Sequence, residues 1–258
     1  MSAFADQVFL LARRSVVRTI RQPANVVFPL VFPMLLLAVN SGGLKAETRL
    51  PGFPTNSFVA FALAVPFIQG ALFATMNAGT DLARDIQTGF LSRLSLTPMR
   101  GIAVLAGQLG GVVTMGVIQA AVYLSVGLAV GVRLASGAFG VLVLFGFAVL
   151  VSLGFGALGA LAALRTGSGE AVQSIFPAFF VFLFISSFNL PRNLIAVTWF
   201  RDIATVNPVS YLIEAVRSLI ITGWDGEALA LAFGIATAIA VVSLALSAWA
   251  LRLRLTRT

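Results

Sequence analysis

The sequence predicts an all-helical membrane protein that crosses the bilayer several times. Of its 258 residues, 59% are hydrophobic and only 10% are charged, whereas an average soluble domain is about 45–50% apolar and about 25% charged. The hydrophobic residues gather in runs of about 20, the length of helix that a hydrocarbon layer about 30 Å thick requires. This composition excludes a soluble enzyme and a disordered or fibrous chain.

Six hydrophobic segments are predicted to span the membrane. They cover residues 24–40, 56–78, 102–130, 137–164, 171–190 and 226–250. With six spans, both termini share one side with eleven of the 17 Lys and Arg residues. Because basic residues concentrate on the cytoplasmic side, we expect a multi-pass protein of the plasma membrane with both termini cytoplasmic. A seventh span at 203–222 would weaken this asymmetry, so that stretch is predicted to be a re-entrant outer hairpin within a single domain, 1–258.

The first 22 residues are predicted to form an amphipathic helix on the cytoplasmic membrane surface. Arginines recur at helical spacing opposite an apolar stripe. The arginines are Arg14, Arg18 and Arg21, and the stripe is Phe9, Ala12, Val16 and Ile20. Such a helix lies in the headgroup plane, and we expect its arginines to face anionic lipid. The alternative is a charged anchor that only orients the first span.

A second cytoplasmic helix is predicted over residues 80–100, between the second and third spans. It is too polar to span the membrane. Its charges follow the helix dipole, since Asp81 and Asp85 come first and Arg93 and Arg100 come last. We interpret it as a short helix with a docking surface for a partner.

The sequence lacks the residues that most catalytic mechanisms require. The absence of Cys and His excludes disulfides, thiolate nucleophiles, Cys/His metal sites and imidazole acid–base chemistry. The cores of the predicted spans hold no Asp, Glu, Lys or Arg, which disfavours a membrane enzyme or a proton-coupled carrier. The net charge of +8 is spread along the chain, which disfavours a nucleic-acid partner. Without a phosphate-binding loop, the chain is expected to hold no cofactor and to depend on another polypeptide for ATP chemistry.

Aromatic residues are concentrated in the second and fifth predicted spans. The residues concerned are Phe61, Phe67, Gln69 and Phe73 in the second span and Phe176, Phe180 and Phe184 in the fifth. In the fifth span the rings recur every four residues along one helical face. We interpret both sets as a path for a hydrophobic or aromatic substrate. The alternative is that the rings face lipid or pack between helices.

Two motifs connect these elements to a known family. The first is NPVSYLIEAVRSLIITG at 207–223, before the last span, and the second is a Gly-x-Leu-x-x-Leu-x-x-x-Pro run in the cytoplasmic helix. The matching positions are Asn207, Pro208, Tyr211, Glu214 and Arg217 in the first and Gly89, Leu91, Leu94 and Pro98 in the second. With the order of elements, they resemble the permease subunits of type 2 ABC exporters over nearly the whole chain, most closely the daunorubicin-resistance-like branch. Residues 85–88 depart from the Glu/Arg-rich family pattern, so polar contacts there are expected to differ.

The resemblance implies a dimer of identical or related permease chains, each docked on a separate nucleotide-binding subunit that uses ATP and Mg²⁺. Contacts to that subunit would come from Asp85, Gly89, Leu91, Arg93, Leu94 and Pro98. The second and fifth spans would line a substrate cavity at the dimer interface. An outer gate would be formed by Asn207, Pro208, Tyr211, Glu214 and Arg217. For Glu214 and Arg217, the alternative is that they only form an ion pair with each other within one helix.

We therefore expect a transport subunit, not an enzyme in its own right, of an ATP-driven exporter of hydrophobic drug-like or lipid-like compounds, in contact with membrane lipid. An alternative with the same architecture is the export of lipid-linked polysaccharide. A sugar channel needs aromatic rings for the sugars to stack on, and the sequence has only two Tyr and three Trp, which disfavours this alternative. A passive channel or membrane scaffold is the alternative from a different class, and it would not require a helix that docks on an ATPase.

Overall fold

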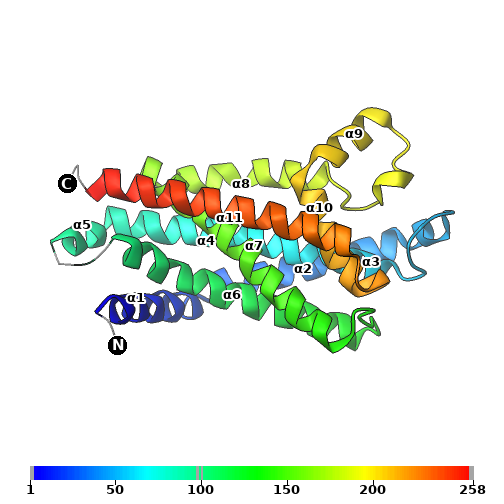
Figure 1. Cartoon of the computed structure of the whole chain (residues 1–258), viewed down its shortest axis with the longest axis horizontal. Helices are drawn as coiled ribbons and strands as arrows, with labels where there is room; N and C mark the ends of the chain where they lie inside the picture. Colours follow the sequence, from blue (N-terminus) through cyan, green and yellow to red (C-terminus); the bar gives the residue numbers. More distant parts are fainter. Residues whose placement is uncertain (1–2, 97–98, 100, 256–258) are drawn as a thin grey trace.

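The computed structural model describes residues 3–96, 99 and 101–255, and this part of the chain is almost entirely helical, with no strand (Figure 1). The helices are α1 (Ala3–Ile20), α2 (Pro23–Gly43), α3 (Phe58–Ala62), α4 (Ala64–Gln87), α5 (Phe90–Ser95), α6 (Gly101–Ala129), α7 (Gly137–Thr166), α8 (Gly169–Phe184), α9 (Thr198–Val206), α10 (Pro208–Arg217) and α11 (Gly226–Leu255). Short helical turns are η1 (Lys45–Arg49), η2 (Arg192–Leu194) and η3 (Ser218–Thr222).

Five segments of the described chain are long and apolar enough to cross a membrane. They are α2, α3 together with α4, α6, α7 and α11. The predicted all-helical, membrane-spanning class is thus confirmed. The predicted span at 171–190 forms α8, an apolar helix of only 16 residues that ends at Phe184. Residues 185–191 are irregular, and the carbonyl oxygens of Ile185, Ser187 and Phe188 accept hydrogen bonds from the side chains of Asn207 and Arg217 at the two ends of α10.

Helix α4 lies at the centre of the bundle. The most apolar part of the α3–α4 segment is 89% buried, and α4 packs extensively against α7, while α1 packs on α6 and α11 on α7 (Figure 1). The approach of α4 to α7 requires glycine, because a Cβ added to Gly79 would lie 2.8 Å from the carbonyl oxygen of Gly159. The two backbones are therefore in direct contact.

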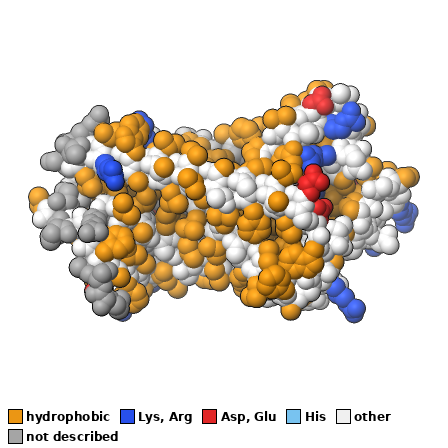
Figure 2. Space-filling view, viewed as in Figure 1, with side chains coloured by type: hydrophobic (Ala, Val, Ile, Leu, Met, Phe, Trp, Pro, Cys, Tyr) orange, Lys and Arg blue, Asp and Glu red, His pale blue; other side chains and the backbone are white. Residues whose placement is uncertain are grey.

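The ends of the bundle differ from its middle in the kind of side chain at the surface. On the face shown in Figure 2, hydrophobic side chains cover the middle and charged side chains lie toward the ends. Helices α1 and α5 lie toward the end at which the chain terminates, and α3 and α9 lie toward the other (Figure 1). This distribution is typical of a protein whose middle lies in hydrocarbon.

Two predicted segments have different boundaries in the structure. Residues 80–87 of the predicted 80–100 helix continue α4, and a separate helix, α5, follows. The break lies at Gly89, whose φ of +69° is left-handed and favours glycine. The predicted 203–222 hairpin consists of the end of α9, then α10 and a π-helical turn.

Candidate functional site

Asn207 joins the start of α10 to the end of α8. Its side-chain oxygen accepts a hydrogen bond from the N–H of Val209 at 2.9 Å, and Pro208 occupies the first helical position, where a missing N–H costs little. Its amide nitrogen donates to the carbonyl oxygens of Phe182 at 2.6 Å and Ile185 at 3.2 Å. These acceptors are among those that a helix leaves unpaired at its C-terminus. Asn207 therefore fastens the last turn of α8 to α10.

Arg217, at the other end of α10, extends this connection. It is 6% exposed, and its Nε, Nη1 and Nη2 atoms donate to the carbonyl oxygens of Phe61 (3.0 Å), Ser187 (2.8 Å) and Phe188 (2.8 Å). Its guanidinium also covers the ring of Phe61, with Cζ 3.5 Å from the ring centroid. One side chain thus links α3 to the segment that follows α8, and so joins the two Phe-rich spans.

Glu214 has a different partner from the one considered in the sequence. Its carboxylate forms an ion pair with Arg192, whose guanidinium also lies 4.5 Å from the ring centroid of Tyr211. Burial acts to lower the pKa of Arg192, but the Glu214 carboxylate and Tyr211 outweigh it, so this pKa is raised. The alternative of an intrahelical pair between Glu214 and Arg217 does not hold, because Arg217 directs its donors to backbone carbonyls.

Two serines that the sequence did not single out complete this arrangement. The Ser210 hydroxyl accepts a hydrogen bond from the N–H of Ser187 at 3.1 Å. We call Asn207, Ser210 and Arg217 the α10 clamp. Ser210 could have been found, since it lies three residues after Asn207 on the same helical face. Ser187 lies in an irregular segment and Arg192 in the three-residue turn η2, and neither is long enough to show a periodicity that would mark them.

A π-helical turn, Ser218–Thr222, follows α10. The N–H groups of Ala135 and Ser136, between α6 and α7, donate to the carbonyl oxygens of Ile220 and Leu219, both at 3.1 Å. Wide turns of this kind are frequent at functional sites. The connection between α6 and α7 is therefore attached to the same unit as the α10 clamp.

A cavity of about 450 Å³ opens beside the clamp. Its wall includes Phe61, Arg192, Tyr211, Glu214, Arg217 and Asp225. The volume falls within the range of about 300–1,000 Å³ that is usual for small-molecule sites. Both charge signs and two aromatic rings line it, which suits a polar or amphipathic molecule. Within the described ranges, no group of three acidic side chains is placed to hold a metal ion.

Four of the seven predicted substrate-path residues form a continuous aromatic ladder. They are Phe73 on α4 and Phe176, Phe180 and Phe184 on α8, with successive ring centroids 5.2, 4.9 and 6.1 Å apart. From α2, Phe28 contacts Phe73 and Phe32 contacts Phe180. Phe28 and Phe184 are about half exposed, so the ladder reaches the surface of the bundle.

The other three predicted path residues lie apart from this ladder. Phe61 lies under Arg217, and Phe67 packs with its ring centroid 5.7 Å from that of Tyr123. Gln69 is fully buried, and neither amide atom is hydrogen-bonded to any part of the chain that the structure describes. Phe61 belongs to α3, and the side chains of α4, which lies at the centre of the bundle, point toward several different neighbours, so the three residues do not share one surface.

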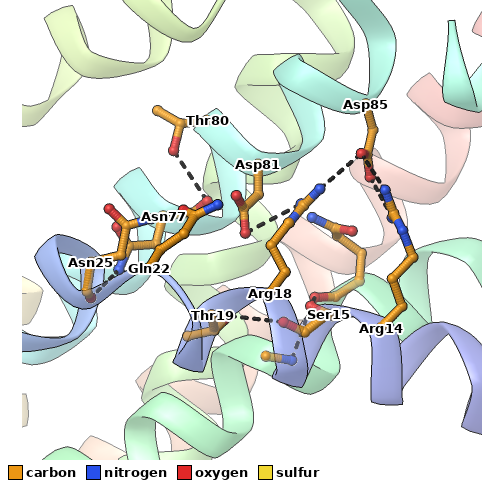
Figure 3. A network of polar contacts seen from close by, with 12 residues as sticks. Arg14, Ser15, Arg18, Thr19, Gln22, Asn25, Asn77, Thr80, Asp81 and Asp85 are labelled. Atoms are coloured by element: carbon orange, nitrogen blue, oxygen red, sulfur yellow. Dashed lines mark hydrogen bonds and ion pairs between the residues drawn. The ribbon is translucent and has the colours of Figure 1, made fainter. Parts of the chain in front are cut away.

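Two arginines of α1 and two aspartates of α4 form an ion-pair network at the opposite end of the bundle (Figure 3). The two terminal nitrogens of Arg14 donate to the two carboxylate oxygens of Asp85, Nη2 to Oδ1 at 2.7 Å and Nη1 to Oδ2 at 2.9 Å. Arg18 binds Asp85 at 2.8 Å and Asp81 at 3.2 Å. The hydrogen bonds to Asp85 raise the pKa of Arg14 against the effect of burial, and its guanidinium lies 3.8 Å from the ring centroid of Phe90 on α5. This network connects α1, α4 and α5.

The network changes the roles expected for these residues. Arg14 and Arg18 were predicted to face anionic lipid, but their guanidinium groups face α4. Asp85 was predicted to contact an ATPase, and its carboxylate is buried against α1. The partners lie 67 and 71 residues apart in the sequence, beyond the reach of any local pattern.

Helix α5 carries most of the remaining residues predicted to couple to a partner. Gly89, Leu91, Arg93 and Leu94 lie in it or directly before it, and Pro98 lies outside the described residues. Leu91 is buried and anchors α5 to the bundle, whereas Leu96, just after the helix, is 87% exposed. Helix α5 is therefore fixed to the bundle on one side, and its other side is open around Arg93.

Comparison with known proteins agrees with this architecture. Residues 6–221 match the ABC-2 type transporter family. The chain is 30% identical to the daunorubicin resistance ABC transporter permease protein DrrB1 of Streptomyces coeruleorubidus over 76% of its own length and 66% of that protein. It is 26% identical to the putative transport permease ycf38 of Cyanophora paradoxa, over 84% of this chain and 74% of that protein. The chain therefore spans about two thirds to three quarters of these relatives, and it belongs to the ABC-2 type transporter family of membrane permeases.

Proposed function

We propose that this chain is the membrane-spanning subunit of an ATP-driven exporter of hydrophobic, drug-like or lipid-like compounds. Two such chains, identical or related, would form a dimer, and separate nucleotide-binding subunits would hydrolyse ATP with Mg²⁺. In this proposal α8 is the sixth span, and both termini are cytoplasmic because eleven of the 17 basic residues share their side. The plasma membrane is the expected location.

The observation that carries this proposal is the connection of α5 to the most buried helix of the bundle. Helix α5 follows α4 directly after Gly89, and Leu91 anchors it. Asp85, one turn earlier, holds α1 through Arg14. A subunit that pushes on the exposed side of α5 would therefore act on α4 and α1 together, as a rigid unit. Motion of this unit would be transmitted to the helices packed around α4.

The aromatic ladder supports a hydrophobic substrate. Its rings come from α2, α4 and α8 and reach the surface of the bundle, and no charged residue belongs to it. A molecule held there would gain from ring stacking and apolar burial. The similarity to a daunorubicin resistance permease favours a drug-like aromatic compound over a sugar polymer.

The α10 clamp supports an outer gate formed by Asn207, Pro208, Tyr211, Glu214 and Arg217. Arg217 bridges α3 and the segment after α8, so separating the two Phe-rich spans at this end requires its hydrogen bonds to break. The neighbouring cavity would then widen toward the ladder.

Transport by reconstituted vesicles tests this proposal. The chain would be co-reconstituted with its ATPase subunit, and ATP-dependent accumulation of daunorubicin would be followed by its fluorescence. We expect Phe180→Ala, in the ladder, to reduce transport several-fold and Phe139→Ala, an exposed ring outside it, to leave transport unchanged. Flux that needs no ATP and no ATPase subunit would instead establish a passive channel.

A further inference from the structure

Helix lengths locate the membrane boundary at the level of α1. Helix α2, with 21 residues, is about 31 Å long, which matches one hydrocarbon thickness of about 30 Å. Near its start, the Asn25 carbonyl accepts a hydrogen bond from the Asn77 side chain of α4 at 3.2 Å. The segment from Phe58 to Asn77 also measures about 30 Å as a helix. Residues of α4 beyond Asn77 therefore extend out of the hydrocarbon, and α1 contacts them there.

The contact between α1 and α6 independently places α1 at the same depth relative to the membrane. The N–H of Gly111 on α6 donates to the Ser15 hydroxyl of α1 at 3.2 Å. From Gly111 to the end of α6 at Ala129 is about 28 Å of helix, again close to one hydrocarbon thickness. A Cβ on Gly107 or Gly110 would collide with α1, so this crossing is tight. Helix α1 thus lies at headgroup level on the side of the bundle where α4 ends.

One face of α1 is directed into the bundle, and the opposite face is open. Asp85 and Asp81 bind Arg14 and Arg18 on the inner face. The open face consists of residues at spacings of three and four, all of them exposed: Asp6, Phe9, Leu10, Arg13, Val17, Ile20 and Arg21. Its single acidic residue, Asp6, lies near the start of α1, and its two basic residues, Arg13 and Arg21, lie farther along the helix. Neither Arg13 nor Arg21 forms an ion pair or side-chain hydrogen bond with any residue that the structure describes.

We propose that this open face of α1 is a binding site for acidic phospholipid, with Arg13 and Arg21 as the headgroup ligands. Guanidinium groups bind phosphate oxygens through paired, charge-assisted hydrogen bonds. The exposed apolar side chains between and beside them, Phe9 and Ile20 above all, contact the acyl chains below the headgroups. Arg13 reaches the phosphate level by extending its aliphatic stem along this apolar face.

Charge and depth together favour lipid over a second protein at this face. This face lies at headgroup level and combines a hydrophobic stripe with two arginines that have no ion-pair partner among the described residues. It matches a leaflet that offers acyl chains and phosphates side by side. Of the three arginines that the amphipathic pattern assigned to lipid, Arg14 and Arg18 are neutralised by aspartates, which leaves Arg21, together with Arg13, to bind the headgroup.

Lipid titration of the purified full-length chain in neutral detergent tests the proposal, with native mass spectrometry to count bound lipid. The probes are dioctanoyl phosphatidylglycerol and dioctanoyl phosphatidylcholine. The test variant is Arg13→Gln with Arg21→Gln. The matched control is Arg49→Gln with Arg133→Gln, which removes two exposed charges at the opposite end of the bundle. The unfolding midpoint of each variant is measured to confirm that it is folded.

We expect the test variant to bind phosphatidylglycerol about 30-fold more weakly, since each basic residue near an anionic surface contributes about 1 kcal/mol. The control variant should bind as the unaltered chain does, and phosphatidylcholine should bind weakly to all three. Equal loss in both variants, or equal affinity for the two lipids, would overturn the proposal. Unchanged binding of phosphatidylglycerol by the test variant would also overturn it. The titration needs no ATPase, so its outcome is separate from that of the transport assay.

Discussion

Replacing Arg217 with methionine removes the hydrogen bonds that join α10 to α3 and to the segment after α8, while keeping a long side chain. The carbonyl oxygens of Phe61, Ser187 and Phe188 would lose their donors. Each buried polar group left unpaired costs about 1–3 kcal/mol. Water from the adjacent cavity can reach part of the site, so we expect a total loss of about 3–5 kcal/mol in the free energy of unfolding.

Thermal unfolding of the purified chain in detergent, followed by tryptophan fluorescence, measures this loss. For a chain of this size, 1 kcal/mol corresponds to about 2–4 °C, so the midpoint for Arg217→Met should fall by about 10 °C. The control is Arg192→Met, which breaks a partly exposed ion pair with Glu214 and should cost at most about 1 kcal/mol. If the two variants unfold at the same temperature, the α10 clamp does not hold this end of the bundle together.

Three further experiments test other contacts. Asp85→Ala and Arg14→Ala, combined in a double-mutant cycle of unfolding free energies, should show a coupling of about 1 kcal/mol or more, and additive effects would refute their pairing. Gly159→Ala should destabilise the chain by about 1–3 kcal/mol because its Cβ would strike the backbone of α4. The control, Gly146→Ala on the same helix, adds a Cβ in open space and should be neutral or stabilising. Equal unfolding midpoints for the two variants would contradict the direct backbone contact. Gly89→Ala should cost about 1 kcal/mol at its positive φ and increase proteolysis near α5, and unchanged proteolysis would show that the break tolerates a side chain.

Composition and apolar run length predicted the long helices well. The predicted spans at 102–130 and 137–164 correspond to α6 and α7 within two residues at each end, because glycines and polar residues border the apolar runs. The predicted 171–190 span is six residues too long at its end. The stretch after Phe184 still contains apolar residues, but its irregular path depends on Asn207 and Arg217, which follow later in the sequence.

The candidate site was predictable only where its residues share one element. The motif at 207–217 singled out Asn207 and Arg217, but the sequence could not show that their partners are backbone carbonyls of α3, α8 and the segment after α8. The spacing of Arg14, Arg18 and Arg21 predicted one shared helical face, which holds for Arg14 and Arg18 but not for Arg21, an exposed residue on the open face. It could not show what that face contacts, since Asp81 and Asp85 approach it only through tertiary packing.

Site-specific cross-linking tests most directly whether α5 meets a separate ATPase subunit. The chain contains no cysteine, so Leu96→Cys introduces a single thiol at a position that is 87% exposed. Val206→Cys, 83% exposed at the opposite end of the bundle, is the matched control. A short bifunctional thiol–amine reagent would be applied to native membranes, and cross-linked products would be identified by mass spectrometry. We predict that Leu96→Cys yields a product containing a phosphate-loop ATPase and that Val206→Cys yields none. Products without an ATPase from Leu96→Cys, or equal ATPase products from both positions, would contradict the proposed coupling through α5.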